Sequence, residues 1–324
     1  MKKCCFILPY FGKFPTNFQI FLNSCKLNSD FNWLIFTDDY TEYAYPENVK
    51  VEYMEFDELK SLIRSKFDFE VSIEKPYKLC DYKPAYGYMF EDYIKDFRFW
   101  GHCDCDLIWG KLNHFIKDSM LEEYDKLFVL GHCCLYKNTH NVNRAFMKSY
   151  MGRERYKEVF THDISCTFDE EYLPDNINFI FEEHGYNVLK EDYSANLCRK
   201  ITDFRLIRFD KVSKNYLTES KNNNFFVYDN GVLKRYYKRF GKLVESEYMY
   251  IHFQSREMKN KLSDDNLLKY KIAANVLIDL EVNEVTEENF GNIKQIYPNN
   301  HKRKIMLGEY RFWKNKIINK LLRK

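Results

Sequence analysis

The chain has 324 residues, and its hydrophobic content of 45% is enough to bury the core of a globular protein. Its 50 basic and 48 acidic residues leave a net charge of +2, which excludes an overall positive field that would draw it onto nucleic acid. No segment offers the roughly 20 consecutive apolar residues of a membrane-spanning helix, and the apolar run Cys4–Leu8 is too short for a secretion signal. We therefore expect a cytoplasmic protein whose ten cysteines are reduced thiols.

Strand and helix patterns alternate through the first 136 residues. The apolar run Cys4–Pro9 predicts a buried strand that ends in a loop around Gly12. The pattern continues with a helix at 16–27, strands at 33–37 and 49–56, helices at 59–69 and 84–93, a strand at 97–100, a helix at 111–124 and a strand at 126–136. This order predicts an α/β fold in which a mostly parallel central sheet is flanked by helices.

The second half of the chain is less regular. Residues 138–196 are polar and show no clear pattern, whereas Asn230-Gly231 between apolar flanks predicts a hairpin. A strand pattern at 248–253 leads into Gln254, and we place no domain boundary before about residue 258.

The last sixteen residues, 309–324, predict a C-terminal helix. One of its faces gathers apolar side chains and most of its lysines and arginines lie elsewhere; the apolar residues are Tyr310, Trp313, Ile317 and Leu321. A basic amphipathic helix of this kind can lie on an anionic membrane, or it can pack on its own domain or on a partner chain.

Two carboxylates one residue apart, Asp104 and Asp106, follow the strand pattern at 97–100. Both can approach one hard cation and leave positions open for phosphate oxygens. Mn²⁺ or Mg²⁺ held there would stabilise the charge on a departing diphosphate. Such acid pairs also occur by chance in solvated loops, but the apolar flanks 99–101 and 107–110 indicate the edge of a sheet, where open α/β folds bind ligands.

Four other segments supply what a metal-diphosphate site needs. After the first strand, Pro9, Tyr10, Phe11 and Gly12 offer an aromatic ring that stacks on a base and a backbone that a nucleotide can approach closely; after the second strand, Thr37 and Asp38 offer hydrogen-bond acceptors to the base. Before the helix at 84, Lys78, Asp81 and Lys83 lie where cations and backbone amides favour an anion. Near the end of the pattern, His252 and Gln254 would face one side, His252 could be a further metal ligand, and Arg256 could bind a phosphate. Each also has an ordinary structural interpretation, such as a core-edge histidine or a helix-capping aspartate.

In this order the segments resemble the small bacterial glycosyltransferases of GT-A fold that are encoded among capsule and lipopolysaccharide genes. The resemblance covers residues 4–136 and 246–258, and its most specific parts are the Lys-Cys-Asp-Lys-Pro pattern at 78–84 and the Asp-x-Asp segment. It implies that the first half binds the nucleotide and that Asp104 and Asp106 bind Mn²⁺ or Mg²⁺. A late histidine often joins such a metal, and here His252 matches it.

The same resemblance implies a domain organisation and an activity. It implies a GT-A-like catalytic domain at 1–258, with a nucleotide-sugar-binding half at 1–136 and an acceptor half at 137–258, followed by a C-terminal helical region at 259–324. The implied enzyme is of the hexosyltransferase type and moves a sugar from a donor, by analogy a UDP-sugar, to a growing cell-surface glycan or a lipid-linked oligosaccharide. Peripheral contact with the inner membrane is then expected through the C-terminal helix.

The acceptor chemistry is expected in the middle of the chain. An inverting transferase needs a carboxylate that takes the proton of the acceptor hydroxyl. We expect this base to be Asp169, with Glu170 as the second choice, because both follow Phe168 in a loop after the nucleotide half. Asp163 is a third candidate. A retaining enzyme needs no such base, and the sequence does not choose between the two stereochemical outcomes.

Three alternatives stay open at the level of sequence. One is a zinc protein whose tetrahedral ligand set is drawn from His102, Cys103, Cys105, His132, Cys133 and His140. No Cys-x-x-Cys spacing is present, which argues against it. The second is a non-catalytic module of the same fold that binds a nucleotide or a glycan. The third is a phosphoryl or nucleotidyl transferase, which also uses paired aspartates and a divalent ion.

Overall fold

The computed structural model describes residues 1–171, 174–210, 212–213, 215–298 and 301–322, with the side chains of helix α10 described at 302–311 and 313–314. The chain forms two compact units, unit 1 at Met1–Tyr193 and unit 2 at Ser194–Lys324. The sequence prediction placed a boundary near residue 258 instead. The units divide earlier because strands on both sides of residue 258 share one sheet in unit 2.

Unit 1 contains a seven-stranded sheet in the order β3-β2-β1-β4-β7-β6-β8. Its strands are β1 (Lys2–Pro9), β2 (Phe31–Thr37), β3 (Val49–Tyr53), β4 (Phe97–Cys103), β6 (Lys126–Leu127), β7 (Cys133–Lys137) and β8 (Val188–Leu189). Strands β3, β2, β1 and β4 run parallel, β7 runs antiparallel to both β4 and β6, and β8 is parallel to β6. The predicted α/β class with a mostly parallel sheet is confirmed.

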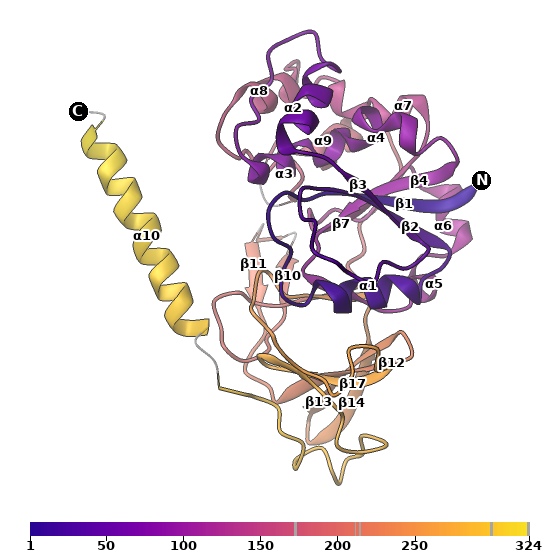
Figure 1. The fold of residues 1–324 in the computed structure, drawn as a ribbon, viewed down its shortest axis with the longest axis vertical. Coiled ribbons are helices and arrows are strands. Elements are labelled where there is room, and N and C mark those ends of the chain that lie inside the picture. The colour runs from indigo at the N-terminus through magenta and orange to yellow at the C-terminus, as the bar shows by residue number, and fades with distance from the viewer. Residues whose placement is uncertain (172–173, 211, 214, 299–300, 323–324) are drawn as a thin grey trace. The chain divides into compact units, whose positions relative to one another are not determined.

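Helices cover both faces of this sheet (Figure 1). The α-helices are α1 (Phe18–Lys26), α2 (Phe56–Arg64), α3 (Leu79–Tyr82), α4 (Tyr86–Met89), α5 (Leu112–Phe115), α6 (Asp118–Glu123), α7 (His140–Asn143), α8 (Arg155–Thr161) and α9 (Ile177–Glu183). The short 3₁₀ helices are η1 (Pro76–Lys78), η2 (Lys83–Ala85), η3 (Glu91–Tyr93) and η4 (Ala145–Met147), and strand β5 (Leu107–Trp109) follows β4. The single helix predicted at 84–93 is therefore a series of short turns, and Pro84 lies in the first of them.

The pleat of β1 shows why both faces are covered. Cys5 and Ile7 belong to a core cluster that also takes side chains from helices α2, α3, α4, α7, α8 and α9. Phe6 points to the opposite face, where its ring lies 5.5 Å from that of Trp33 and 5.2 Å from that of Trp109. A strand that is apolar on both faces needs cover on both, which is why β1 reads as a continuous hydrophobic run.

The order of the strands brings three loops to one edge of the sheet. From β1 the chain moves outward to β2 and β3, and it then returns to place β4 on the other side of β1. Because β1, β2 and β4 are parallel, the loops that follow Pro9, Thr37 and Cys103 all leave from the same edge. The reversal between β1 and β4 is the switch point at which open α/β sheets bind their ligands.

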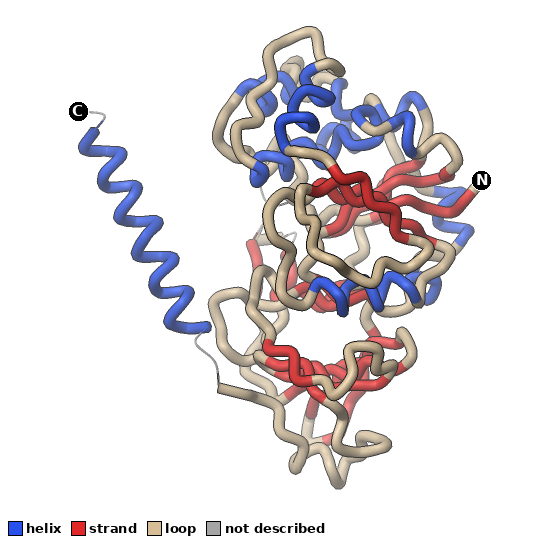
Figure 2. The backbone as a smooth tube through the Cα atoms, viewed as in Figure 1, coloured by secondary structure: helices blue, strands red, loops and turns tan. Residues whose placement is uncertain are grey.

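Unit 2 is built mainly of strands (Figure 2). A six-stranded sheet has the order β14-β13-β12-β17-β18-β16, and β10 and β11 form a separate hairpin. The strands of unit 2 are β9 (Ser194–Asn196), β10 (Ile207–Asp210), β11 (Asn215–Thr218), β12 (Asn224–Asp229), β13 (Val232–Arg239), β14 (Lys242–Glu247), β15 (Tyr250–His252), β16 (Lys259–Lys261), β17 (Lys269–Ala273) and β18 (Val276–Ile278). The hairpin predicted at Asn230-Gly231 is present, and both turn residues have positive φ, of 50° and 87°.

The helical region predicted from residue 259 begins only at α10 (His301–Leu322). Residues 259–278 contain the strands β16, β17 and β18 instead, because β17 pairs with β12 and completes the apolar cluster around Phe225. In α10, Tyr310 and Trp313 are exposed, whereas the side chains of Ile317 and Leu321 lie outside those described, so the expected apolar face stays a prediction. Among the described residues, no helix is long and apolar enough to cross a membrane.

Candidate active site

The acidic pair lies in the short turn between β4 and β5. Cys105 is buried, whereas the carboxylates of Asp104 and Asp106 on either side of it are half-buried. The alternation buries the thiol and turns both carboxylates away from the core. The amide of Asp104 also donates a 3.1 Å hydrogen bond to the carbonyl oxygen of His132, which ties the turn to the loop before β7.

Lys83 connects this turn to a second acidic loop. Its ammonium group lies 2.9 Å from Asp104 Oδ1 and 3.2 Å from Asp169 Oδ2, and it donates a 2.8 Å hydrogen bond to the carbonyl oxygen of Gly131. Burial alone would lower the pKa of Lys83, but the two carboxylates raise it well above its ordinary value. Lys83 is therefore a fixed positive charge between the two acidic segments.

Asp169 and Glu170, predicted as candidate bases, lie on that second loop. Asp169 is 3% exposed and is engaged by Lys83, whereas Glu170 is half-buried. Burial, with a smaller contribution from the neighbouring Asp169, raises the pKa of Glu170 to about 7. Burial also raises the pKa of Asp169, although Lys83 opposes the change. A carboxyl group with a pKa near 7 suits proton transfer at neutral pH.

Gly131 allows this loop to approach the end of the sheet. A Cβ atom at this position would lie 2.6 Å from Asp169 Oδ2 and 2.8 Å from Glu170 Oε1, closer than real Cβ contacts come. A side chain at this position would therefore have to displace the two carboxyl groups, and the φ of Gly131 is not in the left-handed region. No local pattern in the sequence indicates this contact, because Gly131 and Glu170 are 39 residues apart.

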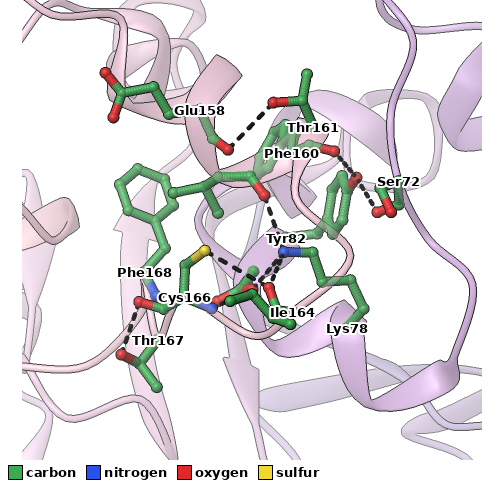
Figure 3. A network of polar contacts seen from close by, with 12 residues as sticks. Ser72, Lys78, Tyr82, Glu158, Phe160, Thr161, Ile164, Cys166, Thr167 and Phe168 are labelled. Atoms are coloured by element: carbon green, nitrogen blue, oxygen red, sulfur yellow. Dashed lines mark hydrogen bonds and ion pairs between the residues drawn. The ribbon is translucent and has the colours of Figure 1, made fainter. Parts of the chain in front are cut away.

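The loop that carries Asp169 is held by a buried ion pair (Figure 3). Lys78 Nζ lies 2.8 Å from Asp81 Oδ2, and it donates hydrogen bonds to the carbonyl oxygens of Val159 and Ile164 at 2.9 and 2.8 Å. The carboxylate of Asp81 accepts backbone hydrogen bonds from Cys166 at 2.8 Å and Phe168 at 3.2 Å. Phe168 directly precedes Asp169, so the ion pair fixes the backbone position from which the Asp169 side chain extends.

Lys78 and Asp81 therefore have a different place from the one predicted. The sequence suggested that they contact a nucleotide, but they are 3% and 0% exposed, and their polar atoms bond to each other and to the backbone of residues 159–168. A buried, mutually neutralised pair has no charge left for an anionic ligand. We assign both residues to positioning of the second acidic loop, and Lys83 is the cation of this segment that reaches the acidic pair.

The loops after β1 and β2 are joined by Asp38 and Asp39. Asp38 accepts a 2.6 Å hydrogen bond from the amide of Gly12, while Asp39 accepts one from the amide of Phe14 at 3.0 Å and binds Lys13 at 2.6 Å. Although burial opposes it, these bonds hold the pKa of Asp39 well below its ordinary range. The sequence places Asp39 in the segment that offers acceptors to a base, whereas in the structure its carboxylate shapes the loop that presents Gly12.

Two aromatic residues of the first loop differ in their surroundings. Tyr10 is half-buried, and burial, with smaller contributions from Cys105 and Asp106, raises its pKa to about 12. Tyr10 therefore lies near the acidic turn, and its predicted stacking on a base stays a prediction. Phe11 was expected to stack on a base, but it is 8% exposed and packs on Phe56 at 5.1 Å within the core.

Pro9 and Thr37 end their strands as buried residues. The hydroxyl of Thr37 accepts a 3.1 Å hydrogen bond from the amide of Asp39, which helps to set the turn after β2. Neither side chain is exposed for a ligand, so what these two positions offer a nucleotide is limited to their backbone and to the loops that they start.

In unit 2, His252 ends β15 and is 6% exposed. Its Nδ1 lies 3.1 Å from Asn196 Oδ1, and Gln254 Nε2 donates to the same oxygen at 2.8 Å. His252 and Gln254 thus meet on one carboxamide, although the strand ends at His252 and Gln254 lies in the turn that follows. Asn196 was not predicted, because it lies 56 residues before His252 in the irregular part of the sequence.

Arg256 does not have the role that the sequence suggested. It is 4% exposed, and its guanidinium donates to the carbonyl oxygens of Cys198, Ile201 and Thr202 and to Asn275 Oδ1. Burial lowers its pKa to about 10. These bonds commit Arg256 to the fold of unit 2, so it is not placed to grip a phosphate.

Among the described residues, one group of His, Cys, Asp and Glu side chains could hold a metal ion. It consists of Asp104 and Asp106 of the acidic turn together with His252. Two carboxylates and one imidazole fit Mn²⁺ or Mg²⁺ in their donor chemistry.

The cysteines of the zinc alternative do not belong to this group. Burial, the largest cause, raises the pKa of Cys103, Cys105 and Cys133 well above the ordinary value for a thiol. Because zinc is bound by the thiolate, this burial opposes the zinc interpretation.

The raised pKa of Glu170 predicts a pH-dependent change in stability. Since the folded-state pKa of about 7 lies above the ordinary glutamate value of 4.5, the folded chain binds more protons between these values and loses stability as the pH rises through this range. Glu170→Gln should therefore raise the free energy of unfolding by about 3 kcal/mol at pH 8 and by much less at pH 4.5. Urea unfolding with EDTA at both pH values measures this; an equal effect at both would contradict it.

The buried ion pair predicts a strong coupling energy. Asp81→Asn should lower the free energy of unfolding by about 3 kcal/mol, because it leaves the Lys78 ammonium buried without its counter-ion. The double variant Lys78→Met with Asp81→Asn removes both charges and should cost less than the sum of the two single changes. A double-mutant cycle in urea measures the difference, and additive effects would show that the pair does not act as a unit.

The comparisons with known proteins place this chain in a family but do not assign it an activity. No curated protein matches the chain. Among solved structures, it is similar to the apo form of mouse xyloside xylosyltransferase 1 at 10% identity and a TM-score of 0.39, over 60% of this chain and 87% of that chain. The model of a family of unknown function, DUF6625, matches residues 6–281. This match spans more than half of the chain, and the protein therefore belongs to the DUF6625 family.

Proposed function

We propose that this protein is a metal-dependent glycosyltransferase that uses a nucleotide-sugar donor. The observation that carries the proposal is the acidic turn of Asp104 and Asp106, which leaves the sheet at its switch point and groups with His252 as a possible metal site. A divalent ion on these ligands would offset the charge of the donor's diphosphate as that group leaves. The sequence resemblance to GT-A glycosyltransferases supports the same activity.

In this proposal, Lys83 positions the acidic turn. Its ammonium group is held by Asp104, Asp169 and Gly131, so Asp104 is already in place at the end of the sheet before a donor arrives. The loops that start at Tyr10 and Asp38 leave the same edge of the sheet and offer backbone groups, an aromatic ring and acceptors to the base. Each of these groups binds or orients the donor without taking part in bond formation.

We assign the proton transfer to Glu170, in preference to the first-choice Asp169. Asp169 is 3% exposed and is the counter-ion of Lys83, whereas Glu170 is half-buried and has a pKa of about 7. In an inverting reaction, the acceptor oxygen forms a bond to the anomeric carbon, the bond to the diphosphate breaks, and Glu170 takes the hydroxyl proton. A retaining reaction would leave Glu170 without this task.

The finer features of the enzyme rest on the resemblance and are part of the same proposal. They are a UDP-linked donor, Mn²⁺ or Mg²⁺ as the ion, hexosyl transfer, and a growing capsule or lipopolysaccharide glycan or a lipid-linked oligosaccharide as the acceptor. Work at the cytoplasmic face of a membrane would agree with the nine basic residues and one acidic residue in 301–324, a charge that favours anionic lipid.

The proposal predicts a metal-dependent turnover that needs Asp106. Purified protein with Mn²⁺ should hydrolyse one member of a nucleotide-sugar panel and release sugar and nucleoside diphosphate. Asp106→Asn should lower the rate at least about 100-fold, since a metal ion contributes several kcal/mol to leaving-group stabilisation. Product analysis by mass spectrometry measures turnover and separates sugar transfer from nucleotidyl transfer, which would release a sugar phosphate from the same donors.

Asp118→Asn is a matched control, because Asp118 is exposed and pairs only weakly with Lys3 at 3.2 Å. It should keep the wild-type rate. Turnover that is independent of Mn²⁺, and equal in the wild type and Asp106→Asn, would remove the acidic turn from the site. Binding of a nucleotide sugar without any turnover would favour the non-catalytic module.

A further inference from the structure

Within unit 2, the surroundings of the His252 side chain are fixed by the pairing of two strands. Strands β9 and β15 pair in parallel, and their register places Asn196 opposite His252. The amide of Leu197 donates a 3.2 Å hydrogen bond to the carbonyl oxygen of His252, which locks the two strand ends together. Side chains opposite each other in such a pair lie on the same face of the sheet. The two strands therefore deliver a carboxamide directly beside the imidazole.

Two donors converge on the oxygen of that carboxamide. Asn196 Oδ1 lies 3.1 Å from His252 Nδ1 and 2.8 Å from Gln254 Nε2. A carboxamide oxygen only accepts hydrogen bonds, so the Nδ1 of His252 carries the proton in this contact. Protonation of Nδ1 in a neutral imidazole puts the lone pair that binds a metal on Nε2.

The turn after His252 keeps Gln254 in place. Gln254 and Ser255 both have positive φ, of 51° and 59°, which costs free energy for residues with a side chain. Arg256 holds the far end of this turn: its amide donates to the carbonyl oxygen of Phe253 at 3.0 Å, and its buried guanidinium binds the 198–202 segment that follows β9. Arg256 thus clamps the chain beyond β15 to the chain beyond β9.

We propose that Asn196 is a positioning residue that fixes the tautomer and the ring orientation of His252, so that Nε2 is presented as the metal ligand, with Gln254 holding the carboxamide. The inference rests on the proposed metal site and adds a residue that the metal-binding set does not contain. Partners of this kind, which bond to the other nitrogen of a metal-binding histidine, typically change metal affinity 10-fold to 100-fold when removed.

The experiment measures tautomer and affinity separately. The ¹⁵N chemical shifts of His252 in metal-free protein report which ring nitrogen carries the proton, and a titration with Mn²⁺ alone reports affinity. Wild type should show the proton on Nδ1. Asn196→Leu should show a mixture of tautomers and bind Mn²⁺ about 10-fold to 100-fold more weakly. Asn196→Asp keeps an acceptor at the same place and should restore the Nδ1 proton.

Two further variants keep the test decisive. Asn283→Leu makes the same chemical change at an exposed position of unit 2 and should match the wild type in both readouts. Gln254→Met removes only the second hydrogen-bond donor to Asn196. It replaces Asn196→Leu in the test if circular dichroism shows that Asn196→Leu does not fold. Gln254→Met should make the imidazole ring of His252 more mobile and weaken Mn²⁺ binding.

The outcomes separate this inference from the proposed activity. An Nε2 proton in the wild type, or an Asn196→Leu variant with unchanged tautomer and Mn²⁺ affinity, would overturn the inference even if sugar transfer is found. The expected shifts and affinities without any donor turnover would support the role of Asn196 and reject the transferase. Absence of Mn²⁺ binding by the wild type would overturn both.

Discussion

The ammonium group of Lys83 is the interaction on which the acidic centre of unit 1 depends. Asp104, Asp169 and Glu170 approach one another in a partly buried place, and like charges there would repel strongly without a cation. Lys83 contacts two of the three carboxylates and a backbone oxygen at the end of the sheet. It therefore joins the turn after β4 to the loop at 164–170 and fixes a positive charge beside a predicted metal.

Around this contact, unit 1 uses buried polar pairs to place loops. Lys78 and Asp81 hold the backbone before Asp169, Asp38 and Asp39 hold the loop after β1, and Gly131 leaves room for the carboxyl groups. The parallel strands supply a common edge, and the polar pairs decide what is presented there. In unit 2, His252 is likewise held in place by the neighbouring strand β9 and by the turn that Arg256 fixes.

Local patterns in the sequence predicted the parts that depend on local physics. The alternating strands and helices of the first 136 residues, the acidic turn after a buried strand and the hairpin at Asn230-Gly231 follow from hydrophobic period and turn chemistry. Contacts between distant residues have no such signature. Arg256 reads as a surface cation until its partners 54 to 58 residues away are known, and Asn196 shows no sign of facing His252.

Binding of one Mn²⁺ ion by the wild-type protein tests the central claim most directly. Electron paramagnetic resonance of free Mn²⁺ during a titration counts the bound ions, and Mg²⁺ added at the end shows whether a hard divalent ion competes. The acidic turn predicts one bound ion per chain, displaced by Mg²⁺ and bound more tightly when UDP is present, because diphosphate oxygens fill the open positions. Free Mn²⁺ that falls by no more than in buffer, with or without UDP, would contradict a metal site at Asp104 and Asp106.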